Sequence, residues 1–148
     1  MDFYLDTYFR GLYLGLTIVI SSFFMDIFIS KKSLDELDHQ QILLYVDGWK
    51  AVLMNLLLVE PLFYAPAAAY LMKPSEYVFS NIEWIPYMEL CLIHNFLYYV
   101  VHRNMHRTKA LQGIHLFHHK FDEVMLPSIG NAVSREEFIL AYTCPFIV

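Results

Sequence analysis

The sequence predicts an all-α fold, an integral membrane helical bundle with about three spans and the start of a fourth. Hydrophobic residues make up 57% of the 148 residues and charged residues only 17%, whereas about a quarter of the residues of a soluble domain are charged. Apolar runs long enough to cross a bilayer alternate with polar stretches. The polar stretch after the third run carries histidines at helical spacing. We therefore expect a single membrane domain over residues 1–148.

The first predicted span covers residues 11–30, where Asp26 is the only charged residue. We expect Asp26, near the end of this span, to lie at the membrane interface. A polar stretch follows from residue 33 to residue 48. Within it, Ser33 followed three residues later by Glu36 predicts a capping box and a short surface helix.

The second predicted span covers residues 51–72 and contains Asn55 and Glu60. Polar groups inside a span generally face other helices or a cavity. For Glu60 we favour a protonated or paired carboxyl group over one that lines a substrate tunnel. The third predicted span covers residues 85–101, and a further apolar segment begins at residue 138 and covers 138–148.

The distribution of basic residues predicts the orientation in the membrane. Three spans place eight of the ten Lys and Arg residues on the side of the histidine-rich region, 102–123, and only Arg10 and Lys73 on the other side. Cytoplasmic loops carry the excess of Lys and Arg, so we expect this region at the cytoplasmic face. The net charge is −5 and the basic residues form no stripe along one helix. We therefore expect no nucleic-acid partner.

The histidines fall into two groups with metal-ligand spacing. His102 and His106 are four residues apart, which places them on one face of a helix. His115, His118 and His119 form an HxxHH group in which the last two return to the face of the first. Two such helices facing each other would bring imidazoles to a common centre, and imidazole binds iron, zinc, copper or nickel. The alternative is that these histidines are polar residues of the membrane interface.

The two groups lie in stretches that resemble the signature of the fatty acid hydroxylase/sterol desaturase family. Residues 95–106, Asn-Phe-Leu-Tyr-Tyr-Val-Val-His-Arg-Asn-Met-His, resemble the pattern D-x-x-x-Y-x-x-H-R-x-x-H. Residues 115–120, His-Leu-Phe-His-His-Lys, resemble the next box, H-x-x-H-H. Residues 51–61 look like the membrane segment that precedes the boxes in that family. The resemblance covers about residues 50–140.

This resemblance implies a cytoplasmic di-iron site that hydroxylates or desaturates a membrane lipid with O₂. Electrons would come from cytochrome b5 or a similar donor, and the expected location is the endoplasmic reticulum. Arg103 would be an outer residue that orients the ligands. The implied metal ligands are His102, His106, His115, His118 and His119.

The sequence departs from the family pattern at three points. Asn95 stands where the family has an acidic residue, and Ser134 stands where it has the histidine of a histidine-proline-x-glutamate element, of which only Glu137 matches. No histidine follows His119, so the family's third histidine box is not in this sequence. These departures support an alternative: a catalytically degenerate member that holds a single zinc or no metal. It would serve as a structural subunit of a larger membrane complex, for example in an organelle inner membrane.

Overall fold

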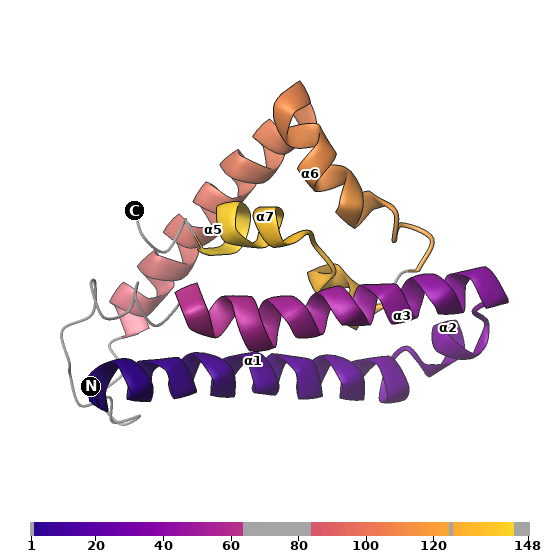
Figure 1. The fold of residues 1–148 in the computed structure, drawn as a ribbon, viewed down its shortest axis with the longest axis horizontal. Helices are drawn as coiled ribbons and strands as arrows, with labels where there is room; N and C mark the ends of the chain where they lie inside the picture. The colour runs from indigo at the N-terminus through magenta and orange to yellow at the C-terminus, as the bar shows by residue number, and fades with distance from the viewer. Residues whose placement is uncertain (1, 64–83, 125, 144–148) are drawn as a thin grey trace.

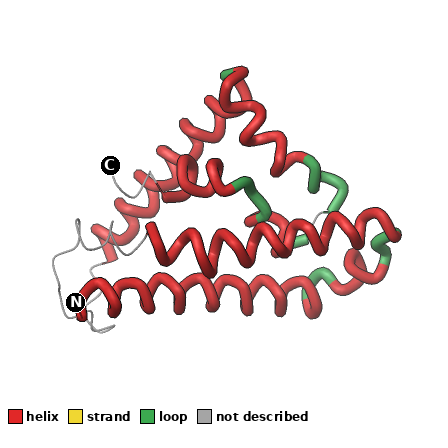
Figure 2. Tube along the Cα trace, in the orientation of Figure 1, coloured by secondary structure: helices red, strands yellow, loops and turns green. Residues whose placement is uncertain are grey.

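The computed structural model describes residues 2–63, 84–124 and 126–143. These residues form helices joined by short loops, with no strand among them (Figure 2). The predicted all-α fold class is therefore confirmed for the described part of the chain.

Two long helices lie side by side and antiparallel (Figure 1). These helices are α1 (Asp2–Phe28) and α3 (His39–Met54), and the short helix α2 (Lys31–Asp35) connects them. The second long helix continues as a π-helical turn, η1 (Asn55–Val59). Pro61 lacks an N–H group and its ring clashes with the carbonyl four residues earlier, which favours a wider turn at this point.

The capping box lies at Asp38, and the prediction of one at Ser33 is wrong. The Asp38 side chain accepts a hydrogen bond from the Gln41 backbone N–H at 2.8 Å, and the Gln41 side chain accepts one from the Asp38 N–H at 3.0 Å. Ser33 lies inside α2, whose N-cap is Ser30. The reciprocal bonds satisfy two donors at the start of α3, so the second long helix begins at His39.

Two helical stretches are long and apolar enough to cross a membrane, by length and composition: Leu5–Phe28 and His39–Phe63. The first contains most of the predicted span 11–30. The second begins well before residue 51, because the polar stretch that precedes it is helical and its charged Asp47 and Lys50 pair with each other at 2.8 Å on the exposed side. The remainder of the predicted span 51–72, from residue 64, lies outside the described residues.

The histidine-bearing helices form an inverted V above the α1–α3 pair (Figure 1). Helix α5 (Trp84–Arg107) contains the predicted third span, 85–101, and is inclined to the two long helices. Helix α6 (Lys109–His119) then returns toward them. Helix α5 is not one of the two membrane-length apolar helices, so the third span and the cytoplasmic position of the histidines stay predictions.

The chain after α6 packs along α3 and η1. It forms η3 (Pro127–Asn131), α7 (Arg135–Glu137) and η4 (Phe138–Thr143). The predicted apolar segment 138–148 is helical as far as residue 143, and its last five residues lie outside the described part. Apolar side chains of this returning chain and of α3 and η1 form the core: Val52, Leu56, Val59, Phe121, Val124, Leu126, Ile129, Ala132, Val133 and Phe138.

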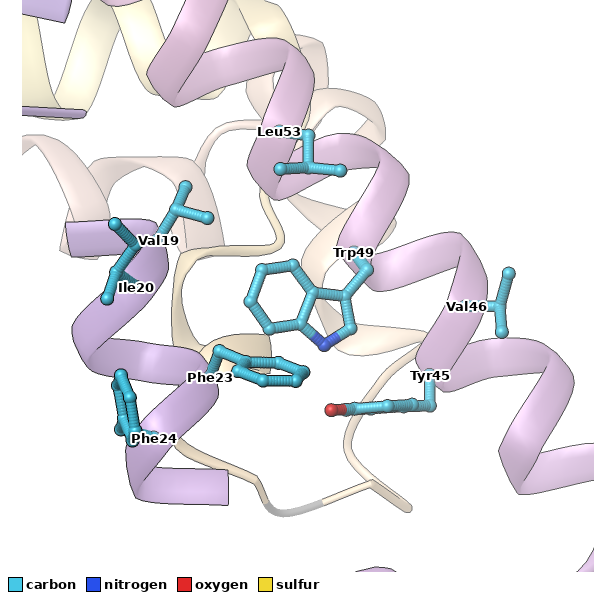
Figure 3. Close-up of a pocket in the computed structure, with 8 residues that line it drawn as sticks. All are labelled: Val19, Ile20, Phe23, Phe24, Tyr45, Val46, Trp49 and Leu53. Atoms are coloured by element: carbon cyan, nitrogen blue, oxygen red, sulfur yellow. The ribbon is translucent and has the colours of Figure 1, made fainter. Parts of the chain in front are cut away.

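An apolar groove of about 670 Å³ runs between α1 and α3 (Figure 3). Its lining residues are Val19, Ile20, Phe23, Phe24, Tyr45, Val46, Trp49 and Leu53. Large apolar side chains such as Tyr13 and Phe28 are more than 70% exposed on α1. Apolar surface this extensive is typical of a protein that contacts lipid or another protein.

Close packing of the two long helices depends on Gly15. A Cβ atom at this position would lie 2.0 Å from the backbone oxygen of Leu56 and 3.2 Å from Oε2 of Glu60. A small residue thus lets the two backbones approach each other. Oε2 of Glu60 is buried there without a hydrogen-bond partner among the described residues.

We expect Gly15→Ala to lower the stability of the protein by about 1–3 kcal/mol, because the added methyl group must push the backbones apart. Thermal unfolding in detergent, followed by circular dichroism, measures the effect. Gly113→Ala is the matched control, since nothing lies within 4 Å of a Cβ atom at Gly113 in α6. An equal melting temperature for Gly15→Ala and the wild type would contradict this account of the helix contact.

Candidate metal centre

Four imidazoles from α5 and α6 meet through their Nε2 atoms. His106 Nε2 lies 3.3 Å from His102 Nε2 and 3.0 Å from His115 Nε2. His119 Nε2 lies 2.9 Å from His115 Nε2. Nitrogen ligands about 2.0–2.1 Å from one metal ion, at angles of 90–109°, are about 2.9–3.4 Å from each other. The ligand atoms of His102, His106 and His115 all lie within 4.8 Å of one another, so these three fit one shared ion, and His119 adjoins them through His115.

The positions of these histidines follow from two helices and the break between them. Thr108 has an extended backbone, with φ −100° and ψ 113°, and separates α5 from α6. The fully buried Met105 precedes this turn. Because residues four apart share a helix face, His102 and His106 point to one side of α5. The turn folds α6 back so that His115 meets them.

Three of the four imidazoles have a partner at the ring nitrogen opposite to the shared centre. A hydrogen bond at Nδ1 fixes the tautomer and orientation of a histidine and leaves Nε2 free as a ligand atom. The Nδ1 pairs are His102 with the Tyr98 hydroxyl at 3.3 Å, His115 with Glu137 Oε1 at 2.7 Å, and His119 with Asp122 Oδ2 at 3.0 Å. All three pairs agree with metal binding through Nε2.

Glu137 is the most buried of these partners. Only 1% of this residue is exposed, and the Ser134 hydroxyl accepts a hydrogen bond from its backbone N–H at 3.1 Å. Its second oxygen, Oε2, is buried without a hydrogen-bond partner in the described part of the chain. A buried unpaired oxygen is costly in an apolar site, and a nearby cation would compensate for it. In the sequence Glu137 stands out only as a match to a family element, and its place beside His115 becomes visible in the structure alone.

Two further predicted site residues lie at the edge of the cluster. His118 turns its Nδ1 toward the Ala132 carbonyl oxygen at 3.3 Å, and its ring centre is 5.9 Å from that of His115. Arg103 is exposed and donates a hydrogen bond to the Tyr99 hydroxyl. Their roles as metal ligand and ligand-orienting residue stay predictions. Three of the five predicted ligands, His102, His106 and His115, thus lie close enough together to bind one metal ion, and His119 lies beside His115. The role of His119 as a ligand stays a prediction as well.

Asn95, which replaces the acidic residue of the family pattern, makes a hydrogen bond within its own helix. Its amide donates a hydrogen bond to the Cys91 carbonyl one turn earlier at 2.7 Å. Tyr98, on the next turn of α5, supplies a polar contact to His102 instead. The sequence did not predict this contact, and only the spacing of four residues between Tyr98 and His102 could have indicated it.

Two imidazoles of the site, those of His102 and His115, are held in the neutral form. Burial, together with the neighbouring imidazoles, lowers the pKa values of His102 and His115 to about 4. Burial also raises the pKa of Glu137 to about 7, against the opposing effect of the nearby imidazoles. Metal ions bind the neutral form of histidine, so at neutral pH these two ligands need not lose a proton first.

No family model, no curated protein and no solved structure matches this chain. The geometry of the site is what indicates a function, because His102, His106 and His115 lie close enough together to bind a metal ion.

We expect Glu137→Ala to weaken binding of a divalent metal by about 10- to 100-fold, because His115 loses the partner that orients its ring. Glu137→Gln should lose less, since the amide oxygen can still accept from Nδ1. Metal titration in detergent, followed by calorimetry, measures the affinity. The control is Glu136→Ala, which changes the exposed neighbouring carboxylate. Equal affinities in Glu137→Ala and the control would exclude a role for Glu137 in orienting a ligand.

Proposed function

We propose that this chain is a membrane-embedded metal protein that hydroxylates or desaturates a lipid with O₂. The convergence of His102, His106 and His115 from two helices, with His119 Nε2 2.9 Å from His115 Nε2, supports metal binding most directly. The resemblance of the two histidine boxes to those of fatty acid hydroxylases and sterol desaturases supports the reaction. The endoplasmic reticulum membrane and an electron donor such as cytochrome b5 belong to the same proposal.

The donor set fits iron, because imidazole is a good ligand for it. When bound, iron would supply the activation of O₂ and the oxidising power for a C–H bond. His102, His106 and His115 define one centre, so the two irons of the resemblance need further ligands. His119 beside His115 and His118 are the candidates, and the contact of His118 Nδ1 with the Ala132 carbonyl leaves its Nε2 free as a ligand atom.

The chain's own residues hold and orient the ligands. His102, His115 and His119 each keep Nε2 toward the centre through a partner at Nδ1. The burial of His115, only 2% exposed, limits the access of water to the metal-facing side of that ring. His106 is exposed, so this protection is confined to the His115 side of the centre.

Apolar surface beside the site supports a lipid substrate. A pocket of about 450 Å³ borders His118, and its walls include the apolar side chains of Phe121, Val124, Leu126 and Ile129. The two membrane-length helices, Leu5–Phe28 and His39–Phe63, would place this part of the chain at a lipid bilayer. The apolar walls of this pocket would suit a lipid chain beside His118.

A second candidate function is a structural subunit of a larger membrane complex with one zinc ion. The centre formed by His102, His106 and His115 favours it, because His119 beside it would add a fourth ligand and structural zinc sites are four-coordinate. The exposed apolar groove between α1 and α3 offers a surface that a partner subunit could cover. Metal identity and copurifying subunits separate the two functions.

Elemental mass spectrometry on protein purified without chelators should find iron, which dialysis against a strong chelator removes. We expect His115→Ala to reduce the metal content by at least about tenfold, because His115 lies between two other ligands. His39→Ala is the control, since His39 is exposed at the start of α3. A single zinc, or no metal, in protein that copurifies with other subunits would favour the structural function and contradict the proposed oxidation.

Lipid analysis of cells that produce the protein tests the reaction. We expect new hydroxylated or desaturated lipids with the wild-type chain, and their loss when both His118 and His119 are replaced by alanine. The His39→Ala variant should keep the products. The same lipid profile in the wild type and the double variant would contradict the proposed oxidation.

A further inference from the structure

Asp26 is a fully buried carboxylate near the end of α1, and its position at the membrane interface stays a prediction. Its exposed fraction is 0%. Oδ2 accepts a hydrogen bond from the Tyr45 hydroxyl at 2.8 Å, and Oδ1 accepts one from the Ser128 backbone N–H at 3.1 Å. A buried carboxylate is costly unless it is hydrogen-bonded, and these two donors compensate for that cost. Asp26 therefore connects α1, α3 and η3.

The residues after Ser128 are attached to α3 and η1 at two further points. Asn55 donates a hydrogen bond from its side-chain amide to the Val133 carbonyl at 2.9 Å, and both groups are buried. Ile129 fills the space above Gly48, where a Cβ atom would lie 2.4 Å from its Cδ1 atom. Residues 128–133 are thus fixed to the two long helices by polar contacts at both ends and by apolar packing between them.

The same stretch carries groups that contact the histidines. The Ala132 carbonyl oxygen is 3.3 Å from His118 Nδ1. Immediately afterwards, the Ser134 hydroxyl caps α7 and so places Glu137, whose carboxylate is 2.7 Å from His115 Nδ1. A displacement of residues 128–133 would therefore move the Nδ1 partners of two imidazoles.

We propose that Asp26 is a positioning residue for the histidine cluster, acting through residues 128–133 on the rings of His115 and His118. This inference rests on the proposed metal function. It assigns to the α1–α3 pair a second task besides membrane insertion, which is to set the orientation of metal ligands that lie on other helices. Asp26 itself touches none of the four converging imidazoles in the described contacts.

Cobalt(II) is the probe for this proposal, because the intensity of its visible absorption reports the number and geometry of its ligands. In the full chain in detergent, Asp26→Ala leaves the Tyr45 hydroxyl and the Ser128 N–H without their acceptor. We expect cobalt affinity about 10- to 100-fold below that of the wild type, together with a changed visible spectrum. Asp26→Asn keeps one acceptor oxygen and should restore part of the cobalt affinity and part of the wild-type spectrum. Ser22→Ala, a change at another buried polar residue one turn earlier on α1, should leave both unchanged.

A second readout is independent of metal. In ¹⁵N-histidine-labelled, metal-free protein, the ring-nitrogen chemical shifts of His115 and His118 report their tautomers, and we expect Asp26→Ala to change them. Folded Asp26→Ala protein with wild-type cobalt binding and wild-type ring shifts would overturn the proposal. If Asp26→Ala fails to fold, Tyr45→Phe replaces it. We then expect smaller changes in cobalt affinity and in the ring-nitrogen shifts, and wild-type values for both would overturn the proposal. Wild-type protein that binds no metal would overturn the proposed function, while the ring shifts would still decide whether Asp26 orients these imidazoles.

Discussion

The packing of residues 121–138 against α3 and η1 is the contact on which the rest of the structure depends. This stretch contributes most of the buried apolar core, including Phe121, Ile129 and Phe138. Complete burial of one such side chain stabilises a fold by about 1.5–3 kcal/mol. Hydrogen bonds from Asn55 and to Asp26 fix the direction of the stretch on this apolar surface. Helix α6 contacts this stretch through two hydrogen bonds, from His115 to Glu137 and from His118 to the Ala132 carbonyl.

The apolar core and the histidine cluster need different kinds of contact from residues 121–138. The core requires close apolar contacts, whereas the histidines require polar partners that keep Nε2 free. The chain separates the two by position. Val133 faces the core and offers its carbonyl to Asn55, while Glu137 turns its carboxylate to His115. Buried polar groups with specific partners confer orientation where apolar contacts alone would allow sliding.

The sequence predicted local features well and some boundaries poorly. The helical spacing of His102 and His106 was enough to place them on one face. The start of the second long helix was placed too late, because the stretch before residue 51 contains charged residues that a hydropathy argument treats as a loop. In the structure Asp47 and Lys50 are exposed and paired, and Asp38 begins the helix with its capping box. Charge content alone could not distinguish an exposed helix face from a loop.

The sequence by itself determined the helices and the histidine faces, because helix formation and i, i+4 neighbours depend on contacts between residues close along the chain. Only the tertiary structure decided which ring nitrogens meet and what lies behind them. The Glu137 carboxylate reaches His115 across 22 positions, and the Asp26 carboxylate reaches Ser128 across 102. Such pairs are set by how α5, α6 and the following segment pack on α1 and α3, and spacing along the chain does not encode that packing.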